Sequence, residues 1–155
     1  MAMNWQLLRF DELTTVQLYA ILALRQQVFI VEQQCVYQDC DGRDQGAHHL
    51  LGWEDESEQS TLVAYLRILP PEKKSGSPAI GRVVTHLDRR GKGLGRAIMR
   101  RCLDALDTLY PHAVATLSAQ QYLISFYQHL GFFIASEGYN EDGIPHIRMI
   151  RNSSV

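Results

Sequence analysis

A glycine-rich basic stretch, RRGKGLGRAIMRR at residues 89–101, holds residue types that could do chemistry. Gly91, Gly93 and Gly95 alternate with larger residues, and glycines let a backbone adopt positive φ angles and approach a ligand closely. The neighbouring arginines add positive charge, and an arginine can grip a phosphate through two parallel N–H groups. The composition alone is compatible with a nucleic-acid surface or with a cradle for the phosphates of a small cofactor.

The elements around this stretch favour the small cofactor. IGRVVT at residues 80–85 predicts a strand, and apolar residues recur at helical spacing from Leu94 until Pro111. The start of a helix has unpaired N–H groups and the positive end of the helix dipole, and both favour phosphate. The formal net charge of −2 argues against a general nucleic-acid-binding domain, which is usually strongly basic.

Two common phosphate-binding patterns do not fit. The P-loop pattern G-x-x-x-x-G-K-[ST] is absent, and G-x-G-x-x-G fails because Arg96 replaces its third glycine. The pattern that fits is R-x-x-G-x-G, from Arg90 through Gly93 to Gly95. Placed between a strand and a long helix, it resembles the acetyl-CoA pyrophosphate loop of the GCN5-related N-acetyltransferases (GNAT).

A second segment, LSAQQYLISFYQHLGFF at residues 117–133, resembles another part of this family. There a buried strand ends at a polar residue, here Gln120, and a short helix ends in F/Y-Y-x-x-x-G-F, here residues 126–132. With both motifs in order, the chain is identified as a member of the GNAT superfamily. It also resembles the ElaA-like branch, through residues 24–33, 64–69, 80–85 and 141–147.

Hydrophobic patterning predicts a mixed α/β chain. Thr14 and Gln17 form a capping-box pattern before a helix, and Gly131 suits the end of another. The expected strands cover about residues 5–10, 47–53, 61–69, 78–87, 113–119, 132–135 and 146–150, and the expected helices 16–29, 94–110 and 122–130. Residues 31–47 and 136–145 are expected to be loops.

The resemblance implies a single GNAT domain over residues 1–155, with a central mixed sheet that splays between its fourth and fifth strands and is flanked by helices. CoA would lie in the opening, with its pantetheine arm on the fourth strand and its pyrophosphate on the glycine loop. The residues expected at the cofactor are Val83, Val84, Thr85, Arg90, Gly91, Lys92, Gly93, Leu94, Gly95, Arg96, Gln120 and Tyr127.

The implied reaction is direct transfer of an acetyl group from acetyl-CoA to a primary amine. A backbone N–H at Val84 or Thr85 would polarise the thioester carbonyl. Tyr127 matches the family's tyrosine and is the expected general acid to the CoA thiolate, since a phenol with a pKa near 10 keeps its proton at neutral pH. The alternative is a core tyrosine whose hydroxyl is bonded elsewhere.

The general base is left open. Some relatives carry a glutamate where this chain has Ala115, so Glu32, Glu141 and His146 are the candidates, directly or through water. His146 has the most suitable ordinary pKa, near 6.5, although it could equally be a structural histidine at a strand start. Acidic side chains in the loops that would flank the acceptor could attract a cationic amine, or could be merely solvated. They are Glu32, Asp39, Asp41, Asp44, Glu141 and Asp142.

Other functions fit less well. Cys35, Cys40, His48 and His49 do not have the usual spacing of zinc ligands, so we expect no metal. A non-catalytic acyl-CoA sensor would keep the glycine loop without needing Tyr127. The sequence shows no membrane-length apolar run and no signal peptide, and its odd cysteine count fits reduced thiols, so we expect a cytoplasmic protein without nucleic-acid or membrane partners. A homodimer is compatible with the sequence, which does not fix the oligomeric state.

Overall fold

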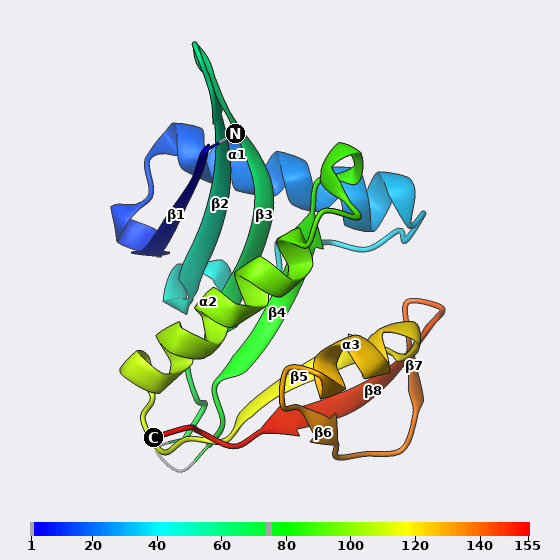
Figure 1. Ribbon diagram of the computed structural model, residues 1–155. Helices are drawn as coiled ribbons and strands as arrows, with labels where there is room; N and C mark the ends of the chain where they lie inside the picture. The colour runs from blue at the N-terminus through cyan, green and yellow to red at the C-terminus, as the bar shows by residue number, and fades with distance from the viewer. Residues whose placement is uncertain (1, 74–75) are drawn as a thin grey trace.

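A mixed eight-stranded sheet runs through the computed structural model, which describes residues 2–73 and 76–155 (Figure 1). The strand order is β1-β2-β3-β4-β5-β8-β6, and β7 also pairs with β8. The strands are β1 (Ala2–Arg9), β2 (His48–Glu56), β3 (Gln59–Leu69), β4 (Ala79–Thr85), β5 (Ala115–Gln120), β6 (Phe133–Ile134), β7 (Tyr139–Glu141) and β8 (Ile144–Arg151). The helices are α1 (Thr15–Arg25), α2 (Leu94–Leu109) and α3 (Ile124–Gln128), and a π-helical segment, Gln26–Glu32, continues α1.

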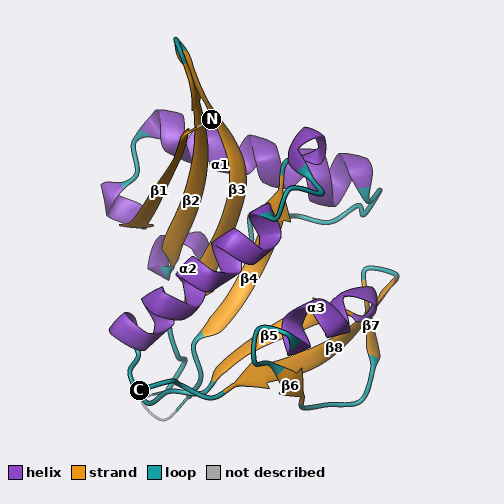
Figure 2. Ribbon diagram, viewed as in Figure 1, coloured by secondary structure: helices purple, strands orange, loops and turns teal. Residues whose placement is uncertain are grey.

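Two helices cover opposite faces of the first four strands (Figures 1 and 2). α2 packs through buried residues such as Ile98, Met99 and Cys102 against one face of the sheet. α1 packs through Ile21 and Leu24 against the other face. This mixed α/β arrangement confirms the predicted fold class. No helix in the described part of the chain is long and apolar enough to cross a membrane.

The start of α1 follows the predicted capping box. The Thr14 hydroxyl accepts a hydrogen bond from the Gln17 N–H at 3.1 Å, and the Thr14 N–H donates to the Gln17 side chain at 2.8 Å. The helix predicted over residues 16–29 lies within a continuous helical stretch, but α-helical geometry stops at Arg25 and the chain continues as a π-helix to Glu32. An apolar helical period does not distinguish these two hydrogen-bonding patterns, so the sequence gives no sign of the change.

The sheet opens between β4 and β5. These strands are parallel, and they pair only at Ala79 with Thr116 and at Ile80 with Leu117. Beyond these pairs the strands diverge, as Figure 1 shows. The splay predicted between the fourth and fifth strands is therefore present, and the edge of β4 that faces β5 is unpaired from Gly81 to Thr85 among the described residues.

The second half of the chain differs in detail from the prediction. Residues 136–145, expected to be a loop, contain β7, which forms a hairpin with β8 around Gly143. The strand is short and its side chains are exposed, so hydrophobic patterning gives no signal for it. α3 is also shorter than expected, because a 3-10 turn, Gln121–Leu123, takes its first residues.

Candidate active site

The divergence of β4 and β5 opens into a cavity of about 820 Å³. Its walls come from distant parts of the chain: the π-helix and the loop after it, β3, β4, β5, α3, and the hairpin of β7 and β8. Seven of the residues expected at the cofactor line it, namely Val83, Val84, Thr85, Arg90, Gly95, Gln120 and Tyr127. The other five, Gly91, Lys92, Gly93, Leu94 and Arg96, lie outside its lining, in the loop and first turn of α2.

The glycine loop has the shape that a phosphate cradle requires. Gly91 and Gly93 adopt φ angles of 79° and 80°, and a Cβ at either would meet nothing within 4 Å. Gly93 caps α2, and the first amide to bond back within this turn is that of Ala97, on the Gly93 carbonyl at 3.0 Å. The N–H groups of the first turn are therefore left for a ligand or water.

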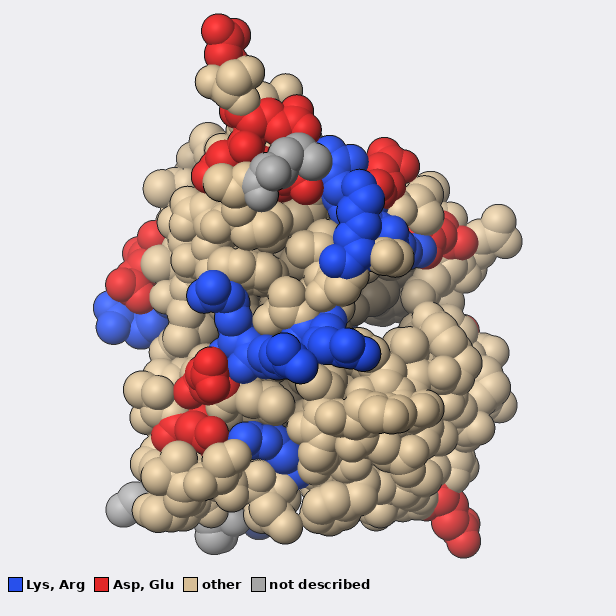
Figure 3. Space-filling model, in the orientation of Figure 1, with Lys and Arg blue, Asp and Glu red and all other residues tan. Residues whose placement is uncertain are grey.

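Basic side chains gather near this loop and along α2 (Figure 3). A second hollow, of about 420 Å³, is lined by Arg96, Arg100, Leu103, His129 and Leu130, between α2 and the end of α3. Nearby, the Arg101 guanidinium lies over the Trp5 ring, 5.0 Å from its centroid. The basic side chains therefore begin in the first turn of α2, where the amides are free, and continue to the middle of the helix.

Tyr127 reaches the cavity from α3. The side chain is 5% exposed and packs edge-to-face against Phe126 and Phe132, with ring centroids 5.1 and 5.8 Å away. Its hydroxyl has no hydrogen-bond partner in the described chain. The oxygen is not fully enclosed by protein atoms, so it faces the open space of the cavity. Burial raises the pKa of Tyr127, and the phenol therefore keeps its proton at neutral pH.

His146 and Glu141 form a pair on the part of the cavity wall that β7 and β8 supply. His146 is 7% exposed, and its Nδ1 lies 2.7 Å from the Ile144 carbonyl oxygen. Since a carbonyl only accepts, Nδ1 carries a proton. His146 Nε2 lies 3.2 Å from Glu141 Oε2. Both atoms are acceptors unless protonated, so the contact is attractive only when a proton lies between the ring nitrogen and the carboxylate. His146 also stacks on Tyr139.

Glu32 has a different partner. Its carboxylate accepts a hydrogen bond from Arg90 Nη1 at 2.8 Å, and the two side chains lie on the cavity wall. Arg90 also donates to the Thr85 carbonyl at 3.4 Å. The pair links the end of the π-helix to the glycine loop, which makes Glu32 a less accessible base than Glu141.

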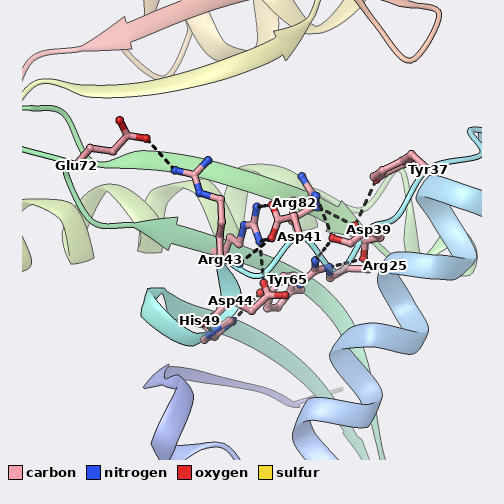
Figure 4. Close-up of polar contacts among 11 residues, drawn as sticks. Arg25, Tyr37, Asp39, Asp41, Arg43, Asp44, His49, Tyr65, Glu72 and Arg82 are labelled. Atoms are coloured by element: carbon pink, nitrogen blue, oxygen red, sulfur yellow. Dashed lines mark hydrogen bonds and ion pairs between the residues drawn. The ribbon is translucent and has the colours of Figure 1, made fainter.

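The expectation of solvated or cation-attracting loop acids is corrected for Asp39 and Asp44, which are buried in ion pairs, whereas Asp41 is also paired but stays partly exposed on the cavity wall (Figure 4). Asp39 and Asp44 are almost fully buried, and all three carboxylates pair with arginines. The pairs are Asp39 with Arg25 and Arg82, Asp41 with Arg67 and Arg82, and Asp44 with Arg25 and Arg67. Three guanidinium groups thus balance three carboxylates.

These pairs shift the titration of the acids. Hydrogen bonds from Arg67 hold the pKa of Asp41 well below its ordinary range. Burial alone would raise the pKa of Asp44, but hydrogen bonds from Arg25 and Arg67 lower it overall. Sequence reasoning missed the arginines, although Arg67 stands inside the apolar run of residues 62–69, a pattern that signals a buried ion pair.

The residues weighed as zinc ligands have other surroundings. His49 is buried, with Nδ1 2.7 Å from the Tyr65 hydroxyl and Nε2 2.8 Å from the Asp44 carbonyl. Cys35 is buried and its Sγ lies 3.6 Å from the Asp142 carbonyl across the cleft, whereas Cys40 is exposed. Within residues 2–73 and 76–155, no three His, Cys, Asp or Glu side chains are arranged to hold a metal ion.

Comparison with known proteins gives consistent matches over nearly the whole chain. A family model for an acetyltransferase (GNAT) domain matches residues 15–152. Protein ElaA of Escherichia coli (strain K12) is 43% identical over 150 residues, which cover 96% of this chain and 95% of that protein. The crystal structure of an acyl-CoA N-acyltransferase from Pseudomonas aeruginosa superposes with a TM-score of 0.90 at 43% identity, covering 97% of this chain and 99% of that one. The crystal structure of Escherichia coli ElaA gives the same TM-score and coverage at 42% identity.

Proposed function

The chain belongs to the GNAT family of acetyltransferases, and from this premise we propose that it transfers an acetyl group directly from acetyl-CoA to a primary amine. The observation that carries the proposal is the cavity between β4 and β5. It brings an unpaired strand edge, a glycine loop at a helix start and an unbonded tyrosine hydroxyl to one site.

The residues present fit acetyl-CoA, which would supply the thioester. Each residue has one backbone N–H and one C=O, and alternate residues of β4 direct both groups to its inner edge. Within Val83–Thr85, the groups on that edge could pair with the amides of a pantetheine arm. The pyrophosphate would meet the first amides of α2, beside the open space at Gly91 and Gly93. Arg96, Arg100 and His129 around the second hollow suit further phosphate oxygens.

Tyr127 is the proposed general acid. Its hydroxyl is free to donate, because no protein group holds it, and its raised pKa keeps the proton in place until a thiolate forms. A backbone N–H of β4, at Val84 or Thr85, would polarise the carbonyl oxygen. Both act within the cavity that these residues line.

The Glu141–His146 pair is the proposed base. His146 Nδ1 is fixed on the Ile144 carbonyl, so any proton taken from the amine must go to the Nε2 side or to Glu141. Glu141 is half-exposed, so an amine or a water molecule can reach it, and it can receive a proton directly or through water. Glu141 and Asp142 are also the cavity acids that remain without an arginine partner among the described residues, so attraction of a cationic amine would depend on them.

An amine screen tests this function. The protein is incubated with acetyl-CoA and a panel of diamines, polyamines, amino acids and short peptides, and release of the CoA thiol is followed against a control without acceptor. Thiol release with at least one amine, matched by the acetylated product in a mass spectrum, supports the proposal. Binding of acetyl-CoA without acetylation of any amine would favour the non-catalytic sensor instead.

A further inference from the structure

One residue in β4 has an unusual backbone for a strand. Arg82 adopts a φ angle of 53°, the left-handed region that residues with a side chain rarely occupy. It lies in a β-bulge, because Tyr65 pairs with Val84 and Arg67 with Gly81, so that Leu66 on β3 faces both Arg82 and Val83. Such a conformation persists only where the surroundings hold it.

The side chain of Arg82 is fixed by hydrogen bonds to Asp39. Its Nε donates to Asp39 Oδ1 at 2.7 Å and its Nη2 to the Asp39 carbonyl at 3.1 Å (Figure 4). Asp39 is itself fixed from the other side by Arg25, whose Nε donates to Oδ2 at 2.8 Å and whose Nη2 donates to the same carbonyl at 3.0 Å. Arg25 is fully buried at the last residue of α1.

The bulge lies at the place where β4 and β5 separate and the cleft begins. The last pair between β4 and β5 is Ile80 with Leu117, and Arg82 comes two residues later, where the strands have begun to diverge. Val83, Val84 and Thr85, the residues that would face the pantetheine arm and the thioester, follow at once. The contact between Arg82 and Asp39 therefore ties the free edge of β4 to the end of α1.

We propose that Arg82, held through Asp39 by Arg25, is a positioning residue that sets the β4 bulge and thereby aligns the backbone of Val83–Thr85 with Tyr127 across the cleft. The role rests on the proposed acetyl transfer. Small misalignment of reacting groups costs roughly 100-fold in rate. Loss of the tether should therefore lower kcat, whereas the affinity for acetyl-CoA, which the phosphates dominate, should stay within about threefold.

Three substitutions at one position separate the tether from the backbone conformation. Arg82→Ala removes the tether and leaves the left-handed strain. Arg82→Gly also removes the tether, but glycine adopts this φ freely. Arg82→Lys keeps one donor for Asp39. In each variant Asp39 keeps its pair with Arg25, so the fold should be retained.

The kinetic expectation is specific. kcat should fall roughly 10- to 100-fold in both Arg82→Ala and Arg82→Gly, and Arg82→Lys should recover part of it. Arg151→Ala is the matched control, because it breaks a buried pair with Asp107 that is not part of the cavity lining, and it should lower the melting temperature without changing kcat. A wild-type kcat in Arg82→Gly, or a raised acceptor KM at unchanged kcat, would overturn the proposal.

Hydrogen exchange gives a readout that does not depend on turnover. The amides of residues 79–85 should exchange faster in Arg82→Ala and Arg82→Gly than in the wild type, and at the wild-type rate in Arg151→Ala. Unchanged exchange in the Arg82 variants would refute the tether even if no acceptor had been found. If the wild-type protein acetylates no amine, the proposed function is refuted. The role of Arg82 in fixing β4 would then still be tested by the hydrogen-exchange result.

Discussion

Tyr127→Phe removes the proposed acid with little other disturbance. The hydroxyl has no protein partner in the described residues, so its loss leaves no buried group unsatisfied. The ring keeps its edge-to-face contacts with Phe126 and Phe132. The free energy of unfolding should therefore change by less than about 1 kcal/mol, and the affinity for acetyl-CoA should change little.

The effect on turnover should be large by comparison. General acid catalysis contributes about 10²–10⁴ in rate. Because burial raises the pKa of Tyr127, it is a weaker acid than an exposed phenol, and we expect the lower end of that range. A 100-fold loss of kcat corresponds to about 2.7 kcal/mol in the activation free energy.

The assay is thiol release at saturating acetyl-CoA, with Tyr110→Phe as the control at a tyrosine outside the cavity lining. Calorimetric titration with CoA and thermal melts show whether binding and stability are intact. If Tyr127→Phe retains kcat within about threefold of the wild type, the thiolate leaves without help from this residue and the assignment of the acid is wrong.

Two further expectations concern the base and the buried ion pairs. Glu141→Gln should lower kcat/KM roughly 10- to 100-fold near neutral pH, and less at high pH because the amine is already deprotonated there. If the ratio of wild-type to variant kcat/KM is the same at every pH, the base assignment is contradicted. The native pKa values of Asp41 and Asp44 lie below their unfolded values, so the stability that they contribute is present above about pH 4 and is lost as the pH falls through the native values. Thermal melts should therefore show a falling melting temperature below about pH 4, less steep in Asp44→Asn, and an equal pH dependence in both proteins would refute this cause.

The motifs that could be predicted from sequence are local. The glycine loop needs only glycines between a strand and a helix, and the structure places Gly91 and Gly93 at positive φ as expected. Likewise, the segment around Tyr127 carries its helix, its aromatic packing and the positive φ of Gly131 within a few residues. Short-range patterns of this kind leave a direct trace in the sequence.

The features that could not be predicted are long-range. Arg25, Asp39 and Arg82 look like separate surface charges in the sequence, and only the folding of β4 beside the end of α1 makes them one buried cluster. The β4 bulge leaves no trace either, since arginine is not a residue that indicates positive φ. The same cluster neutralises the loop acids, so the expected acidic wall shrinks to the hairpin of β7 and β8.

The most direct test is the change in melting temperature caused by acetyl-CoA in the wild type, in Gly93→Glu and in Gly42→Glu. At a ligand concentration 100 times its Kd, binding adds about 2.7 kcal/mol of stability, which raises the melting temperature of a chain of this size by roughly 5–10 °C. The two glycines have nearly equal φ angles, 80° and 79°, and open surroundings, so both variants should lose similar intrinsic stability. A carboxylate at Gly93 would occupy the phosphate path, so we expect the shift to vanish there and to persist in Gly42→Glu. No shift in the wild type, or an equal shift in Gly93→Glu, would contradict a CoA site at the start of α2.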